Sequence, residues 1–299
     1  MTVRMGIIGM SPGNGHPYSW SAICNGYDPE AMADCGFPVI PQYLAERSWP
    51  EDQLPGAKVT HVWTQDPVES RKIARAARIG TVVERPEDML GEIDALLLAR
   101  DDAQNHLRFA SPFLQAGLPV YIDKPVALSE ADFETLHDRQ QRPGQIFSCS
   151  ALRFASELKL DHETAERIGP IRLVQAMTPK NWQTYAVHLI DPVLNLLGHE
   201  AEPKRLFAGP VGADGRMLAL RWSEHGPDVH VMATGSGVPS PLSLRVVGNL
   251  GEVTMVFRDS FSAFRAALAE FLGGVEEGHS RLPEDFNRRV VQIIEMGLQ

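Results

Sequence analysis

One lysine stands where it could take part in a reaction. Tyr121-Ile122-Asp123-Lys124-Pro125 ends a short apolar segment with an acid, an amine and a proline. If this segment is a buried strand, it brings Lys124 to the carboxyl edge of a sheet, where open α/β sheets bind ligands. We predict that Lys124 donates a proton or holds a reacting oxygen. The alternative is an exposed lysine that merely ends the strand.

His188 and Asp191 form a second candidate pair, in Val187-His188-Leu189-Ile190-Asp191-Pro192. Residues three apart share one face of a helix. An imidazole suits proton transfer with a substrate hydroxyl near neutral pH, and a neighbouring carboxylate could hold the ring in place. The alternative for Asp191 is a cap on a helix that begins at Pro192 and stops at Gly198.

A glycine-rich turn follows the first apolar segment, and it reads Gly9-Met10-Ser11-Pro12-Gly13-Asn14-Gly15-His16. Glycines at this place let the backbone approach a pyrophosphate at a helix N-terminus. We therefore predict that this turn approaches a dinucleotide. The spacing is not GxGxxG and Pro12 lacks an amide donor, so a plain tight turn is the alternative.

Two further residues belong to the predicted cofactor site. The position that usually holds an acid for a ribose hydroxyl falls on Thr64, while Asp66 is better explained as a helix cap. The missing acid leaves NAD and NADP both open. His106 follows the apolar segment at Ala95 and could line the site. The alternative is a surface histidine at a helix start.

Four polar or aromatic residues could contact an oxygen-rich substrate. Arg153 and Lys180 could bind its oxygens, and Trp182 and Tyr185 could form an apolar wall against a sugar face. Packing or surface roles are the alternative for each of them.

The expected elements divide the chain into two domains. Over residues 1–124, strands alternate with helices, which is typical of a parallel, doubly wound Rossmann sheet that binds a dinucleotide. Over residues 125–299, strands with few helices between them favour an α+β domain with a large open, mostly antiparallel sheet, used for substrate binding and oligomerisation. Its expected strands are Ile146 to Ser150, Ile171 to Met177, Phe207 to Gly209, Met217 to Trp222, Val229 to Thr234, Leu242 to Val247 and Glu252 to Phe257.

Residues 17–57 are rich in proline, glycine and aromatic side chains and show weak periodicity. We expect a long irregular insertion there, of the kind that is often functional.

Composition excludes several classes of protein. The net charge of −10 argues against a nucleic-acid partner, and no apolar run is long enough to span a membrane. Cys24, Cys35 and Cys149 show neither disulfide nor metal-ligand spacing, so we expect reduced thiols and no metal. The N-terminus lacks the apolar region of a signal peptide, which leads us to expect a cytoplasmic protein.

The sequence resembles the Gfo/Idh/MocA family of oxidoreductases along nearly its whole length. The resemblance rests on Asp123-Lys124-Pro125, where the family usually has Glu-Lys-Pro, and on His188-Leu189-Ile190-Asp191, which matches its HxxD element. Ser150-Ala151-Leu152-Arg153-Phe154 and Val247-Gly248-Asn249-Leu250-Gly251-Glu252 match later parts of the family pattern.

This resemblance implies an enzyme that uses NAD or NADP to transfer a hydride to or from a sugar, cyclitol or related polyol. Lys124 would be the catalytic lysine and His188 the proton-transferring histidine. Gly9, Gly13 and Gly15 would contact the cofactor. A homodimer or homotetramer is expected, because a large open sheet needs cover. The turn at Gly9 is enlarged, and many members carry an aspartate where this chain has Thr184. These departures keep a second hypothesis open, that of a regulatory protein that binds a nucleotide or another ligand without catalysis.

Overall fold

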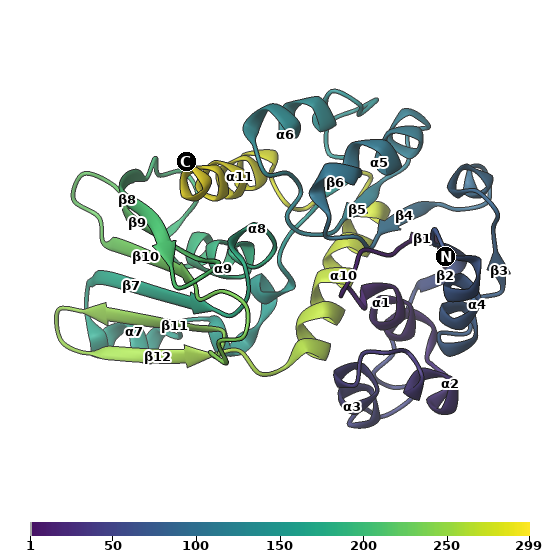
Figure 1. Cartoon of the computed structure of the whole chain (residues 1–299), viewed down its shortest axis with the longest axis horizontal. Helices are drawn as coiled ribbons and strands as arrows, with labels where there is room; N and C mark the ends of the chain where they lie inside the picture. The colour runs from purple at the N-terminus through teal and green to yellow at the C-terminus, as the bar shows by residue number, and fades with distance from the viewer. Residues whose placement is uncertain (1) are drawn as a thin grey trace. The chain divides into compact units, whose positions relative to one another are not determined.

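The computed structural model describes residues 2–299 of the chain and divides into two compact units (Figure 1). Unit 1 comprises residues up to Val126, Glu134–Ser148 and Phe264–Pro283. Unit 2 comprises Ala127–Phe133, Cys149–Ala263 and Glu284–Gln299. Each unit is built around a sheet of six strands, and the two sheets differ in kind. The predicted fold class is confirmed, whereas the domain boundary at residue 124 stays a prediction.

The sheet of unit 1 is parallel throughout, with strand order β3-β2-β1-β4-β5-β6. This is the doubly wound order. Successive strands are added on one side of β1 up to β3 and on its other side from β4, and a crevice forms between the carboxyl ends of β1 and β4. All four residues of β4 are buried, as expected for a strand that is covered on both faces. The strands are β1 (Val3–Ile8), β2 (Ala57–Trp63), β3 (Thr81–Val82), β4 (Ala95–Leu98), β5 (Val120–Ile122) and β6 (Ile146–Phe147).

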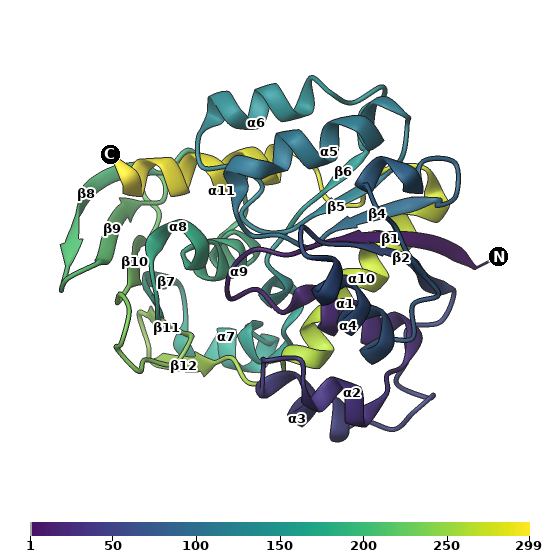
Figure 2. The ribbon, with the colours of Figure 1, turned by 45° about the vertical axis from the view of Figure 1, so that its right-hand side comes forward.

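Helices cover both faces of this sheet (Figure 2). Each crossover between neighbouring parallel strands carries a helix, so the helices divide between the faces according to the direction of winding. Phe271 of the long helix α10 packs against Tyr121 and Phe147 from β5 and β6. The helices are α1 (His16–Asn25), α2 (Pro29–Ala33), α3 (Val39–Ala45), α4 (Pro67–Ala76), α5 (His106–Gln115), α6 (Glu130–His137) and α10 (Ser260–Glu277).

The expectation of an irregular insertion at residues 17–57 is wrong, because the segment contains α1, α2 and α3. Eight of the ten residues of α1 are buried, from Pro17 to Cys24, so no polar face remains to give the sequence a helical period. The start of α2 carried a readable signal that we missed. Asp28 caps it by accepting from the amide of Ala31, and Pro29 follows at the first helical position.

A second correction concerns the strand expected at Ile146 to Ser150. Ile146 and Phe147 form β6, which pairs in parallel with β5 at the edge of the first sheet instead of joining the second. The side chain of Gln145 explains the placement, since its amide donates to the carbonyls of Leu114 and Leu118 at the end of α5. A two-residue strand has no periodicity, so neighbours in space decide its partner.

The sheet of unit 2 has the order β12-β11-β7-β10-β9-β8, and every neighbouring pair is antiparallel except β7 with β10. Along β7 and β10, alternate residues are buried, among them Val174, Ala176, Val229 and Val231. The helices therefore cover one face and leave the other partly open. The strands are β7 (Ile171–Thr178), β8 (Lys204–Val211), β9 (Gly215–Arg221), β10 (Asp228–Ala233), β11 (Ser243–Gly248) and β12 (Glu252–Val256).

Four helices complete unit 2: α7 (His162–Ile168), α8 (Trp182–Tyr185), α9 (Val187–Leu197) and α11 (Glu284–Leu298). The indole of Trp182 in α8 donates to the carbonyl of Ile294 in α11, and Gly297 leaves room for the ring. Among residues 2–299, no helix is long and apolar enough to cross a lipid bilayer. Cys24, Cys35 and Cys149 are free and buried.

Candidate functional site

The carboxyl edge of the first sheet gathers the loops that follow β1, β2, β4 and β5. Because these strands are neighbours in the sheet, loops from distant parts of the sequence meet there. The side chains of this edge are polar and largely buried: Ser11, Asn14, Arg100, Asp123 and Lys124 are each less than 9% exposed. Such a concentration of buried polar groups indicates a binding site rather than a packed core.

Lys124 belongs to a chain of polar contacts across this edge. Its ammonium lies 3.3 Å from Oδ2 of Asp101 in the loop after β4. Oδ1 of the same carboxylate accepts from the Ser11 hydroxyl at 2.5 Å, and Ser11 in turn accepts from the amide of Asp101. The lysine side chain is only 6% exposed, so the alternative of a surface lysine is wrong. Its catalytic role stays a prediction.

Asp123 is a buried carboxylate with three polar partners at this edge. It accepts from Nδ2 of Asn14 at 2.8 Å, lies 2.6 Å from Nδ1 of His16, and accepts from the amide of Lys124 at 2.8 Å. Burial alone raises the pKa of a carboxyl group. The charge and hydrogen bond of His16, the charge of Lys124 and the hydrogen bond from Asn14 outweigh it and hold the pKa of Asp123 below its usual range.

The glycine turn has the features of an anion cradle. Within residues 2–299, the backbone amides of Ser11, Gly13 and Gly15 donate no hydrogen bond. Gly13 has a positive φ of 78°, and a side chain added there would meet nothing within 4 Å, so open space lies beside it. Three free amides and open space at the start of α1 fit a pyrophosphate.

Gly9 and Gly15 are explained by packing as well. A methyl group on Gly9 would lie 2.5 Å from Pro17, and one on Gly15 would lie 2.7 Å from Ile40. These two glycines let the turn close against its own helix and against α3. Their predicted contact with a cofactor is not required to explain them.

Thr64 supports the start of α4, and its predicted contact with a ribose stays a prediction. Its hydroxyl donates to the carbonyl of Asp66 and lies 2.9 Å from the Ser70 hydroxyl, so it fixes the start of α4. The next residue, Gln65, faces the glycine turn, where its amide pairs with both the N–H and the C=O of Met10. The Arg100 guanidinium joins this contact: it donates to the Met10 carbonyl at 3.2 Å and to the side-chain oxygen of Gln65 at 3.0 Å.

The sequence analysis did not predict Gln65 and Arg100 as site residues. The length of the glycine turn is the signal that could have indicated them. An enlarged loop needs extra polar anchors for its backbone. No carboxylate takes the position after β2, which agrees with the sequence in leaving NAD and NADP both acceptable.

His106 holds two loops together instead of facing solvent. It is 1% exposed, with Nε2 at 2.7 Å from the carbonyl of Arg100 and Nδ1 at 3.0 Å from that of Val126. The alternative of a surface histidine is therefore wrong. Because both ring nitrogens have partners, His106 supports the loops after β4 and β5, and a direct contact with the cofactor stays a prediction.

In unit 2, Ser150 connects the predicted pair on α9. Its hydroxyl lies 2.8 Å from Nδ1 of His188, and its amide donates to Oδ2 of Asp191 at 2.6 Å. The two residues share a helix face, as expected. Asp191 lies inside α9, so the alternative of a cap before a helix at Pro192 is wrong. Sequence analysis missed Ser150 because nothing in the spacing joins it to residues 38 and 41 positions later.

Asp191 is fully buried, and opposing effects act on the pKa of its carboxyl group. Burial raises the pKa of this carboxyl group to about 7, even though the charge of Arg153 and the Ser150 amide both lower it. The Arg153 guanidinium lies 3.5 Å from Oδ1 of Asp191, without the alignment of a hydrogen bond. The same guanidinium stacks 3.9 Å over the ring of Phe286, so Arg153 is held by the core as well as by charge.

Lys180, Tyr185 and His188 form a polar cluster in unit 2. The Lys180 ammonium donates to the Tyr185 hydroxyl and lies 4.3 Å above its ring. The ring of Tyr185 meets that of His188 edge to face at 5.1 Å. An amine, a phenol and an imidazole together suit an oxygen-rich substrate. Trp182 is 3% exposed and packs against α11, which accounts for it without a ligand.

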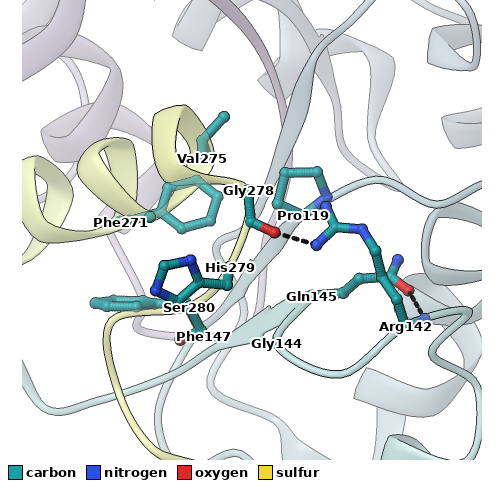
Figure 3. Close-up of a pocket in the computed structure, with 11 residues that line it drawn as sticks. Pro119, Arg142, Gly144, Gln145, Phe147, Phe271, Val275, Gly278, His279 and Ser280 are labelled. Carbon is teal, nitrogen blue, oxygen red and sulfur yellow. Dashed lines mark hydrogen bonds between the residues drawn. The ribbon is translucent and has the colours of Figure 1, made fainter.

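A separate cavity in unit 1 does not suit a cofactor. It is lined by Phe147, Phe271, Arg142 and His279, among others, with Arg142 donating to the carbonyl of Gly278 (Figure 3). The cavity volume of about 10 Å³ is roughly the room that one water molecule needs. Nowhere between residues 2 and 299 do three or more His, Cys, Asp or Glu side chains gather as metal ligands.

The parallel sheet, the glycine turn and the polar carboxyl edge define a dinucleotide-binding domain. The family model described as "Oxidoreductase family, NAD-binding Rossmann fold", that of the Gfo/Idh/MocA family, matches residues 40–150. This match agrees with the predicted family and with the Rossmann fold of the first sheet. The expected nicotinamide cofactor and oxidoreductase class agree with this description.

Solved structures share the fold over the whole chain. Myo-inositol 2-dehydrogenase from Lactobacillus plantarum is 15% identical with a TM-score of 0.75, covering 100% of this chain and 97% of its own. Myo-inositol dehydrogenase from Lactobacillus casei, in complex with NAD(H) and myo-inositol, is 16% identical with a TM-score of 0.72, covering 99% and 93%. Scyllo-inositol dehydrogenase from the same organism, with bound NAD(H) and scyllo-inositol, is 14% identical with a TM-score of 0.70, covering 98% and 95%. A comparison with curated protein sequences finds no match.

Proposed function

We propose that this protein is an NAD(P)-dependent oxidoreductase that transfers a hydride between the nicotinamide and a hydroxyl or keto carbon of a sugar, cyclitol or related polyol. The observation that carries the proposal is the buried Lys124–Asp101 ion pair beside the open glycine turn. Inositol dehydrogenases with the same fold support the substrate class. Lys180 and Tyr185 supply donors for a ligand rich in hydroxyl groups.

The residues present fit a dinucleotide. The free amides of Ser11, Gly13 and Gly15 would hold its pyrophosphate, and Gln65 would lie on the side of the adenine ribose. When bound, the nicotinamide supplies the hydride acceptor or donor that the protein's own side chains lack.

His188 is proposed as the group that takes the proton from a substrate hydroxyl. The Ser150 hydroxyl can either donate to Nδ1 or accept from it, because it rotates freely. When it accepts from a protonated Nδ1, it holds the ring with Nε2 able to take a proton, and the same hydrogen bond persists after the transfer. Lys124 is proposed to stabilise the negative charge that develops on the substrate oxygen. Asp101 would keep its ammonium in position.

Two measurements test this proposal in sequence. The first is titration of intrinsic tryptophan fluorescence with NADH and NADPH. The second is turnover on a panel of polyols and keto sugars, for wild-type protein and for Lys124→Ala. Cofactor binding that persists in Lys124→Ala while turnover falls by about 10²- to 10⁴-fold supports the proposal. Unchanged turnover rejects the role of Lys124.

The regulatory hypothesis is the other outcome of these measurements. Thr184 stands where many family members have an aspartate, and its hydroxyl donates to Asn181 at 3.0 Å at the start of α8. Binding of nucleotide without turnover on any substrate of the panel would favour a ligand sensor. Location in the cytoplasm and a homo-oligomeric state belong to the same proposal.

A further inference from the structure

The carboxylate of Asp123 joins the glycine turn to the lysine that follows it in sequence. Asn14 reaches it at 2.8 Å from the β1–α1 loop, and His16 reaches it at 2.6 Å from the first position of α1. The amide of Lys124 reaches it from the end of β5. The loop that would hold the cofactor and the residue that would stabilise the reacting oxygen therefore share one anchoring group.

His16 is placed as the adjustable member of this anchor. Its ring stacks on Trp20 at 4.9 Å with an interplanar angle of 13°, and it meets Phe264 edge-on at 5.0 Å. These two aromatic contacts fix the ring plane while Nδ1 faces Asp123. The imidazole is 17% exposed, whereas Asp123 is 1% exposed.

The two ring nitrogens differ in their surroundings. Nδ1 has Asp123 as its partner, and within residues 2–299 Nε2 takes part in no hydrogen bond or ion pair. Nε2 is also not among the described atoms that are both buried and unpartnered, so it remains accessible to water. The bond to Asp123 is therefore the single polar restraint on the ring.

We propose that His16 is a positioning residue: its hydrogen bond to Asp123 fixes the start of α1 to the carboxylate that also binds Asn14 and the Lys124 amide. This inference rests on the proposed function and adds to it a residue whose effect passes through Asp123. Without the bond, Asp123 keeps Asn14 and the Lys124 amide, but the turn loses its restraint at the start of α1. Misplacing a reacting group by about 1 Å can cost 10²-fold in rate.

Two substitutions separate the hydrogen bond from the aromatic packing. His16→Phe keeps a ring against Trp20 and Phe264 but has no donor for Asp123. His16→Asn loses the ring but carries an amide donor near the position of Nδ1. If the hydrogen bond matters, His16→Phe lowers the affinity for NADH or NADPH and the turnover by about ten- to a hundredfold, while His16→Asn stays within about threefold of wild type.

Hydrogen exchange of the protein without nucleotide gives a readout that does not depend on activity. The hydrogen-bonded amides of the turn, those of Gly9, Met10, Asn14 and His16, exchange faster in His16→Phe than in wild type, and His16→Asn restores their protection. Equal affinity and equal exchange in wild type and His16→Phe overturn the inference alone. If His16→Asn instead binds nucleotide more weakly than His16→Phe, the effect comes from aromatic packing, and this result also overturns the inference. Wild-type protein that binds neither nucleotide contradicts the proposed function, and that result is known before any variant is made.

Discussion

The Ser150 hydroxyl lies 2.8 Å from Nδ1 of His188, and the amide of the same serine donates to Asp191 at 2.6 Å. Asp191 therefore influences the imidazole indirectly, because it fixes the backbone of the serine whose hydroxyl contacts the ring. A serine oxygen that accepts from a protonated Nδ1 keeps the same hydrogen bond before and after Nε2 takes a proton, as the proposed proton transfer requires.

Replacing this hydroxyl tests that relationship. Ser150→Ala keeps the amide that binds Asp191 and removes the partner of His188, so we expect kcat to fall by about tenfold or more with little change in the KM for the cofactor. The loss of the bond from the Leu152 amide to this hydroxyl costs about 1 kcal/mol of stability at most. Steady-state kinetics across pH 5–9 measures the effect. Ser156→Ala, at an exposed serine nearby, serves as the control, and equal kinetics in both variants would show that the hydroxyl is dispensable.

Asp191 makes the stability of unit 2 depend on pH. Its pKa of about 7 lies above the value near 4 of an unfolded chain, so between these values the folded state binds more protons than the unfolded state. Ionisation of Asp191 then lowers the free energy of unfolding as pH rises from about 4 to 7. The difference in free energy of unfolding between Asp191→Asn and wild type should therefore be more favourable to the variant at pH 8 than at pH 5.

Urea unfolding at both pH values checks this expectation, with midpoints compared between variant and wild type. Asp285→Asn, at an exposed aspartate, is the matched control, and its difference from wild type should not change with pH in the same way. A difference for Asp191→Asn that is the same at pH 5 and pH 8 would contradict the raised pKa.

The glycine turn can be tested with a pair of strained variants. Gly13 and Gly36 have φ values of 78° and 81°, and in both cases open space surrounds the position of an added methyl group. Gly13→Ala and Gly36→Ala should each lose about 1 to 2 kcal/mol of stability from the left-handed backbone. Only Gly13→Ala should also weaken nucleotide binding, which fluorescence titration measures. Equal affinity in the two variants would remove Gly13 from the cofactor site.

Asp101 is predicted to position the ammonium of Lys124. Asp101→Asn keeps a hydrogen-bond acceptor for Ser11 but removes the charge that lies 3.3 Å from the lysine. We expect kcat to fall by about tenfold while the Kd for nucleotide changes little, because the cradle amides are untouched. Single-turnover kinetics separates the two effects. A weaker Kd with unchanged kcat would place Asp101 in cofactor binding instead.

The open face of the second sheet gives a prediction about assembly. Met232 lies on β10 between the buried Val231 and Ala233, so its side chain faces away from the covered side. Light scattering at micromolar concentration should give the mass of a homodimer or homotetramer, and Met232→Asp should shift it toward the monomer. A monomeric wild-type protein would contradict the expectation.

Elements with strong local signals could be predicted from the sequence, and elements decided by neighbours could not. The run Ala95 to Leu98 is apolar throughout, and Asp66 and Pro67 mark the start of α4. Helix α1 is buried nearly all round, which removes its period, and β6 is too short to have one. Both needed knowledge of what packs beside them.

The candidate site divides in the same way. Lys124, His188 and Asp191 stand out because their spacing and position limit what they can do. Other residues of the site act through hydrogen bonds to partners at least 35 positions away in the sequence. They are Ser150, Gln65, Arg100 and Asp123. Partners so far apart leave no mark in a single sequence, since any polar residue at those positions would look the same.

The stack of Trp20 between His16 and Tyr121 gives the protein an internal optical reporter. Its indole lies 4.9 Å from the His16 ring and 4.6 Å from the Tyr121 ring, inside the unit that carries the glycine turn. A variant in which the other four tryptophans are replaced would emit only from this indole. Its emission would then report nucleotide binding beside the turn without any attached label.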